Sequence, residues 1–131
     1  MPSLFSRIVS GEIPAYKVAE TNHCLAFLDI NPLAKGHTLV IPKKEVDYIF
    51  DVEDELYKDL WHFSKQVAIA IKKAIPCKRI GVAVIGLEVP HAHIHLIPMN
   101  RVSDMNFAGQ KLSFSKEELE EVSAQIRKEF I

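Results

Sequence analysis

The chain has 131 residues and a formal net charge of −1 at pH 7, with 48% apolar and 25% charged residues. This composition is typical of globular proteins. The near-zero charge argues against broad binding to nucleic acid or to an anionic membrane surface, because both need a basic surface. We therefore expect a single domain over residues 1–131 and neither nucleic acid nor membrane as a partner.

Three features bear on the location of the protein. The N-terminal stretch MPSLFSRIVSGEIP has no long apolar run and no cleavage pattern, so we expect no signal peptide. No stretch reaches the length of about eighteen apolar residues that a membrane helix needs. Cys24 and Cys77 are too few for a disulfide scaffold, which predicts free thiols and a cytoplasmic protein.

The N-terminal third predicts a short helix and three strands. Apolar residues at helical offsets, closed by Gly11 and Pro14, indicate a helix over Leu4–Val9. Pro32 and Gly36 mark the loop before the third strand, and Pro42 ends that strand. The predicted strands are Tyr16–Glu20, Cys24–Asp29 and His37–Ile41.

The strongest periodic signal lies between Asp51 and Ile75. Apolar residues recur there at intervals of three and four, which predicts one long amphipathic helix. Asp51 is the expected N-cap, and Lys72, Lys73 and Pro76 mark the other end.

The C-terminal part predicts two more strands and a terminal helix. The strands are Ile80–Ile85 and His91–Ile97, on either side of Gly86. Met99–Phe114 has no period and predicts a long surface loop. Ser115 begins the terminal helix, with a glutamate three residues later in capping-box spacing. The order of elements predicts an α+β fold, with about five antiparallel strands, one long helix and a C-terminal helix.

The stretch EVPHAHIHLIPM holds three of the six histidines of the chain. A strand has a side-chain period of two, so His91, His93 and His95 are expected to project from one face. The alternate residues are apolar and are expected to face the core, namely Ala92, Ile94 and Leu96.

Three interpretations of this histidine face remain open from the residues alone. The first is a set of ordinary surface or core histidines, although three adjacent imidazoles repel each other once protonated. The second is a zinc site, because three imidazoles can supply the protein ligands of a catalytic zinc. The third is catalysis at phosphorus, in which one neutral imidazole attacks and another protonates the leaving group. We favour the third.

The chain resembles the histidine triad (HIT) family of nucleotide hydrolases and transferases. The similarity covers roughly residues 4–98, in the blocks IVSGEIPAYKVAE, LAFLDINPLAKGHTLVIPKKE and GLEVPHAHIHLIP. The branch that it resembles most includes adenosine phosphoramidase. The resemblance implies a HIT-like fold, a purine nucleotide substrate such as an adenosine 5′-phosphoramidate, no cofactor and no metal in the protein, and a homodimer.

The resemblance also implies a catalytic role for four histidines. His93 matches the nucleophile that carries the nucleotide transiently. His95 matches the histidine that contacts the phosphate and supports the leaving group. His91 matches the structural first member of the triad, and His37 matches the upstream histidine of the supporting hydrogen-bond network.

Further residues match the nucleotide-binding positions of the family. Asp29 matches the carboxylate that holds the ribose hydroxyls. Gly86 and Glu88 lie in the segment that approaches the phosphate. Glu88 is a departure, since relatives often carry Ser or Thr there, and Ile80 replaces an amide. The positions that match the base pocket are Leu4, Phe5, Ile8, Phe27 and Ile30.

We expect attack on the α-phosphorus of a purine nucleoside monophosphate derivative of the phosphoramidate type, through a covalent nucleotidyl-histidine intermediate. Two alternatives in the same class are hydrolysis of a dinucleoside polyphosphate or of a nucleotidyl sulfate. The rival from another class is a nucleotide-binding protein without catalytic activity, which the lost phosphate contacts at Ile80 and Glu88 make credible.

Overall fold

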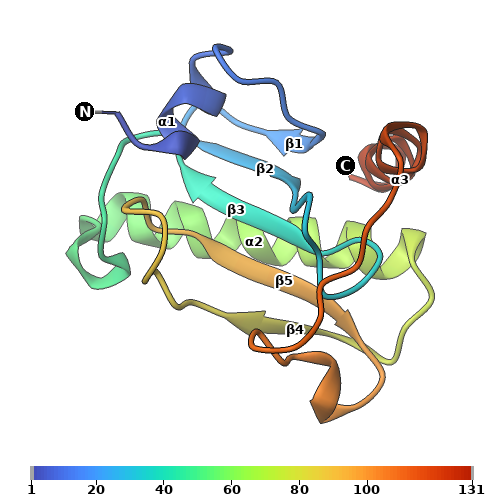
Figure 1. Cartoon of the computed structure of the whole chain (residues 1–131). Helices are drawn as coiled ribbons and strands as arrows, with labels where there is room; N and C mark the ends of the chain where they lie inside the picture. The colour runs from blue at the N-terminus through green and yellow to red at the C-terminus, as the bar shows by residue number, and fades with distance from the viewer. Residues whose placement is uncertain (1, 131) are drawn as a thin grey trace.

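The computed structural model describes residues 2–130, which form a five-stranded antiparallel sheet and three α-helices (Figure 1). The strands lie in the order β1-β2-β3-β5-β4. This architecture confirms the α+β fold predicted from the sequence. The strands are β1 (Lys17–Glu20), β2 (Cys24–Leu28), β3 (Thr38–Pro42), β4 (Arg79–Ala83) and β5 (Ile94–Met99), and the helices are α1 (Leu4–Val9), α2 (Asp54–Ala74) and α3 (Lys116–Glu129).

The two long helices cover one face of the sheet, and Figure 1 shows α2 running behind the strands. The apolar stripe of α2 packs there against alternate residues of the central strands, such as Ala26, Val40 and Ile94. The amphipathic pattern therefore predicted the buried side of α2 correctly. None of the helices within residues 2–130 has both the length and the apolar character needed to cross a membrane.

A second, smaller apolar cluster lies on the opposite face of the sheet. Phe5 and Ile8 of α1 pack there against the residues of β2 and β3 that point away from α2. Every residue of β2 and β3 is consequently buried. Burial on both faces explains why these two strands read as continuous apolar runs instead of alternating ones. The members from the strands are Leu25, Phe27, Leu39 and Ile41.

The N-terminal cap predicted from the sequence is confirmed for α3 and wrong for α2. At α3, Ser115 and Glu118 form the predicted capping box. At α2 the predicted N-cap was wrong: Glu53 caps the helix by accepting a hydrogen bond from the backbone N–H of Leu56 at 3.0 Å. Asp51 instead ends a short 3-10 turn two residues earlier, which delays the start of the helix.

The boundaries of β5 require another correction. The strand begins at Ile94, so His91 and His93 precede it and only His95 is a strand residue. The N–H of Ala92 donates to the carbonyl oxygen of Val46 at 2.7 Å, a loop contact outside the sheet. The three histidines are buried, because Phe5 of α1 and Phe107 of the segment after β5 pack against this face. That segment also contains a 3-10 turn at Val102–Asp104 within the predicted loop.

Gly36 turns the chain into β3 with a positive φ of 91°, and a Cβ there would lie 3.0 Å from Cγ1 of Ile75. Gly11 has a similar φ of 86° but nothing within 4 Å of its Cβ position. We expect Gly11→Ala to lower the free energy of unfolding by about 1 kcal/mol through backbone strain alone. Gly36→Ala adds a clash and should cost about 2–4 kcal/mol. Urea unfolding of both variants tests this, and equal losses would contradict it.

Candidate active site

A cavity of about 470 Å³ opens on the sheet face that carries α1. It collects residues from the two ends of the chain and from the strands between them. Among the residues predicted for the site, all except His91 line it. The lining residues from that prediction are Leu4, Phe5, Ile8, Phe27, Asp29, Ile30, His37, Gly86, Glu88, His93 and His95.

One end of the cavity has an apolar wall formed by α1 and β2. Phe5 and Phe27 are buried and meet edge to face, with ring centroids 5.4 Å apart. Leu4 and Ile30 are 46% and 61% exposed, so these two are not core residues. Exposed apolar side chains at the mouth of an apolar cavity are suited to covering a flat ring.

His91 lies behind the cavity and is fully buried. Its Nε2 is 2.7 Å from the carbonyl oxygen of Pro42, which can only accept, so Nε2 carries the proton. Its Nδ1 is then an acceptor for the hydroxyl of Ser3 at 2.8 Å. Both ring nitrogens are engaged, so His91 orients its surroundings and has no nitrogen available for a ligand.

The same reasoning fixes the tautomer of His93. Its Nδ1 lies 2.8 Å from the carbonyl oxygen of His91 and must donate to it. In the neutral ring, Nε2 then has a free lone pair. Because His93 lines the cavity, this lone pair is available to an electrophile bound there.

His37 and His95 form a directional pair. The N–H of Leu33 donates to Nδ1 of His37 at 3.0 Å, so neutral His37 carries its proton on Nε2. That Nε2 lies 3.0 Å from Nδ1 of His95 and donates to it. Neutral His95 therefore holds its proton on Nε2, and its ring neighbours that of His93 with centroids 4.9 Å apart. The carboxylate of Asp29 lies 3.7 Å from Nε2 of His37.

Burial keeps this pair neutral. Burial lowers the pKa of His95 to about 3, and the neighbouring His93 and His37 contribute further to the shift. Burial also lowers the pKa of His37 to about 4, although Asp29 partly opposes this. Burial lowers the pKa of His91 as well, although the hydrogen bond to the carbonyl oxygen of Pro42 partly opposes this shift. Neutral imidazoles near pH 7 are the form that both a nucleophile and a hydrogen-bond donor of this kind require.

Four aromatic rings stand in a row along the cavity. The centroids of Phe5 and His93 lie 5.0 Å apart, those of His93 and His95 4.9 Å, and those of His95 and Phe107 4.8 Å. The row gives the cavity a direction: it runs from the apolar wall of α1, past the two histidines, to the segment after β5.

The sequence analysis missed several residues near the histidines. Ser3 and Ser6 bridge His91 to the carboxylate of Glu45, with Ser3 N at 2.6 Å and Ser6 Oγ at 2.7 Å from Glu45 Oε1. The hydrogen bond from Ser3 N is the main reason that the pKa of Glu45 lies below its ordinary value. Ser3 is 88 positions from His91, so no local sequence signal links them.

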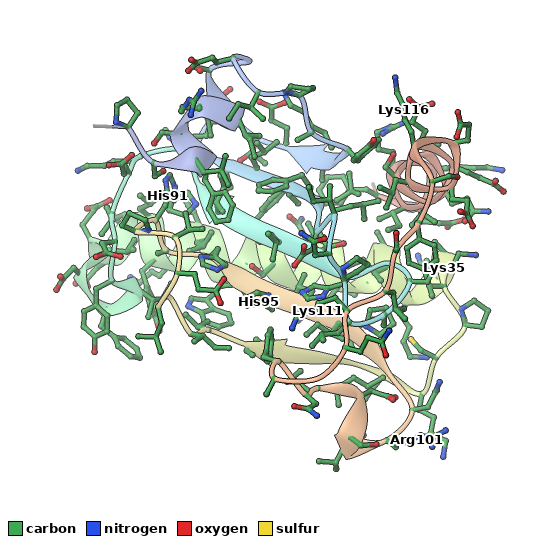
Figure 2. All side chains as sticks on the ribbon, viewed as in Figure 1. Lys35, His91, His95, Arg101, Lys111 and Lys116 are labelled. Atoms are coloured by element: carbon green, nitrogen blue, oxygen red, sulfur yellow. The ribbon has the colours of Figure 1, made fainter. Side chains whose placement is uncertain are left out.

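Lys111 was also missed, although it lines the cavity together with Phe107. Figure 2 labels it together with His95, which lines the same cavity. The sequence predicted a surface loop here from which Phe107 could reach the site, and the approach of the segment to the cavity depends on tertiary contacts.

The two departures from the family pattern lie in different places. Glu88 is exposed and lines the cavity, as does Gly86, which has a positive φ of 71°. Ile80 lies on β4 and packs against the main core, and it does not line the cavity. The missing amide at Ile80 is therefore replaced by core packing, whereas Glu88 adds a carboxylate to the mouth of the site.

The geometry bears on the zinc interpretation of the triplet. His91 has both nitrogens engaged, so the three histidines cannot ligate one ion together. Asp29, His37 and His95 offer donor atoms within 4.8 Å of one another. However, the nitrogens of His37 and His95 that face each other share a hydrogen bond. A metal at bond lengths of about 2 Å would have to replace it.

Comparison with known proteins decides the family. The HIT domain profile matches residues 10–102, which is most of the chain. The chain belongs to the HIT family. It lies in the branch that includes the adenosine 5′-monophosphoramidases. The adenosine 5′-monophosphoramidase hnt1 of Schizosaccharomyces pombe is 36% identical over 97% of this chain and 100% of its own length.

Solved structures of other HIT proteins share the fold. A Hit-like protein involved in cell-cycle regulation from Bartonella henselae has a TM-score of 0.84 and 32% identity, over 97% of this chain and 95% of that chain. A zinc-bound histidine triad family protein from Mycobacterium smegmatis has a TM-score of 0.82 and 26% identity, over 97% and 91%. The HIT-like fold expected from the sequence is thus confirmed.

The depressed pKa values of His37 and His95 predict how stability depends on pH. Below about pH 6.5 these two imidazoles bind protons in the unfolded chain. In the folded protein His37 binds its proton only near pH 4 and His95 only near pH 3. The free energy of unfolding should therefore fall as the pH drops from 6.5, by up to about 1.4 kcal/mol per pH unit for each group.

Urea unfolding between pH 6 and 5 measures this slope, because ordinary carboxyl groups titrate mostly lower. We expect a smaller slope in His37→Gln than in the parent. His62→Gln is the matched control, since His62 is an exposed histidine on α2. Equal slopes in the two variants would show that the buried pair is not responsible.

Proposed function

We propose that this protein is a nucleotide hydrolase that attacks the α-phosphorus of a purine nucleoside monophosphate derivative through Nε2 of His93. The observation that carries the proposal is the pairing of complementary tautomers. His93 keeps a lone pair on Nε2 and His95 keeps its proton on Nε2, and the centroids of the two rings are 4.9 Å apart. Membership of the HIT family supports the same reaction.

The first step forms a bond between phosphorus and Nε2 of His93. The bond between phosphorus and the leaving group breaks, and its electron pair goes to the leaving atom. The leaving nitrogen takes a proton from solvent water, so the amine departs neutral. The Nε2–H of neutral His95 donates a hydrogen bond to the phosphate oxygens and stabilises the charge that develops there. His37 orients this donor, because its Nε2–H donates to His95 Nδ1.

In the second step water attacks the phosphorus of the nucleotidyl-histidine. The water releases a proton to solvent, and the phosphorus–nitrogen bond to His93 breaks. The electron pair returns to Nε2, and a nucleoside monophosphate leaves. The enzyme regains its starting protonation state, and no metal takes part in either step of this proposal.

The remaining residues of the cavity position the nucleotide. The apolar wall of α1 and β2 receives the purine, and Asp29 accepts hydrogen bonds from the ribose hydroxyls. Gly86 allows the backbone to approach the phosphate closely, because it has no side chain and its φ of 71° is one that glycine adopts without strain. A phosphoramidate is the substrate type that we favour, by similarity to the phosphoramidase relatives.

Mass spectrometry of protein quenched during turnover of adenosine 5′-phosphoramidate tests the proposal. We expect the mass of one adenylyl group on the peptide that contains His93. His93→Ala should lower kcat/KM by roughly a thousandfold or more. His62→Ala changes an exposed histidine of α2 that does not line the cavity, so this variant should retain the parent activity.

Two outcomes would contradict the proposed reaction. A parent protein that binds AMP but never turns over the phosphoramidate would be the non-catalytic binding protein. Turnover with an adenylyl group on another residue would displace His93 from its role. Comparison with a dinucleoside polyphosphate as substrate separates the phosphoramidase from the polyphosphate hydrolase.

We further propose that residues 1–131 form a single HIT-like domain and that the protein is a cytoplasmic homodimer. α3, which follows the segment matched by the family profile, packs on α2 and β1 and so belongs to the same core. Cys24 and Cys77 are both free thiols, which suits a reducing compartment. β4 is an edge strand, and its Val82 is 49% exposed, so this edge can pair with a second copy.

Sedimentation velocity tests the homodimer. We expect the parent to sediment as a dimer and Val82→Lys to shift it towards monomer, because a charge on the edge strand opposes strand pairing. Val102→Lys is the matched control, since Val102 is exposed in the 3-10 turn. A monomeric parent, or equal behaviour of the two variants, would refute pairing through β4.

A further inference from the structure

The segment after β5 builds the end of the cavity that lies opposite α1. Phe107 meets His95 and also His37, with centroids 4.8 and 6.4 Å apart. The N–H of Leu112 donates to the carbonyl oxygen of Pro32 at 2.8 Å and holds the segment against the β2–β3 loop. Asn106 closes a turn by accepting from the N–H of Gly109 at 3.0 Å. Lys111 is therefore presented by an anchored segment.

Lys111 is the one Lys or Arg among the described residues that line the cavity. His37 and His95 are neutral near pH 7 because burial depresses their pKa values, and the carboxyl groups that line the cavity are Asp29 and Glu88. A phosphorylated ligand brings further negative charge. Lys111 is then the cavity's only fixed positive charge within residues 2–130, and its charge already reaches His37 strongly enough to lower the pKa of that imidazole.

The ammonium group of Lys111 is held at present by uncharged partners. It donates to the backbone carbonyl oxygens of Phe107 and Gly109, both in its own segment. No carboxylate pairs with it among the salt bridges of the described residues. Exchanging backbone carbonyls for an anionic ligand oxygen replaces neutral hydrogen bonds with stronger charge-assisted ones.

We propose that Lys111 determines substrate choice by binding an anionic group on the leaving-group side of the α-phosphate. This inference rests on the proposed function, which places the purine at α1 and the α-phosphorus at His93. The row of rings then puts His95, Phe107 and Lys111 beyond the phosphorus, where the leaving group lies. The anionic group is a carboxylate, as in an amino-acid phosphoramidate, or a further phosphate.

Isothermal titration calorimetry with four ligands tests this binding without requiring turnover. The full-length His93→Ala protein is titrated with the glycine phosphoramidate of AMP and with the glycinamide phosphoramidate, which has the same shape but lacks the carboxylate. ADP and AMP form the second pair and test a phosphate. We expect the anionic member of at least one pair to bind five- to tenfold more tightly, and added salt to reduce this ratio.

Substitution of Lys111 in the same background identifies the group responsible. Lys111→Met should bring the ratio close to one, and Lys111→Arg should retain most of it. Lys116→Met is the matched control, because Lys116 is an exposed lysine at the start of α3 that does not line the cavity. A ratio lost only in the glycine pair assigns a carboxylate, and one lost only in the ADP pair assigns a phosphate.

The other outcomes overturn the inference. They are a ratio near one in both pairs before Lys111 is changed, a ratio that survives Lys111→Met, and equal losses for all four ligands. Equal losses would place Lys111 on the α-phosphate. A lysine with only a structural role would not change the ratio within a pair. Turnover of adenosine 5′-phosphoramidate by the parent protein is measured separately, so a failed reaction and a failed role of Lys111 remain distinguishable.

Discussion

Ile94 and Leu96 fix the face of the sheet on which His95 lies. Both are almost fully buried in the core under α2, and a slip of one residue would move them to the other face. His95 pairs with Leu39 of β3 and Ala83 of β4. The position of its imidazole is thus set by the main core. His37 and His93 lie next to it on the loops before β3 and β5. The position of the histidine site is therefore set by the alternation of apolar residues in β5.

The second constraint is dehydration. The face opposite α2 is closed by α1 at one end and by the segment around Phe107 at the other. The imidazoles are therefore buried, and burial keeps those of His37 and His95 neutral. A backbone carbonyl or amide fixes the proton position in His37, His91 and His93, and the Nε2–H of His37 fixes it in His95. The order of donors and acceptors from Leu33 through His37 to His95 separates the two chemical roles that His93 and His95 would perform.

Much of the fold could be predicted because its signals are local. The stripe of α2, the capping box at Ser115 and the alternation of β5 each depend on residues close in sequence. The start of β5 could not be predicted, since a contact between Ala92 and Val46 replaces strand pairing. Ser3 and Lys111 reach the histidines only through the tertiary fold. A loop sequence does not specify such contacts, and a resemblance that ends near residue 98 did not extend to Lys111.

The two walls of the cavity come from opposite ends of the chain, α1 near the N-terminus and the segment from Phe107 to Lys111 near the C-terminus. Neither of these two segments is a strand of the sheet, and each is held by contacts to the strands and loops beside it. A molecule long enough to touch both acts as a cross-link between segments about a hundred residues apart. Binding of such a molecule opposes local unfolding of both segments. Local unfolding of either segment therefore weakens binding of the ligand to the other one as well.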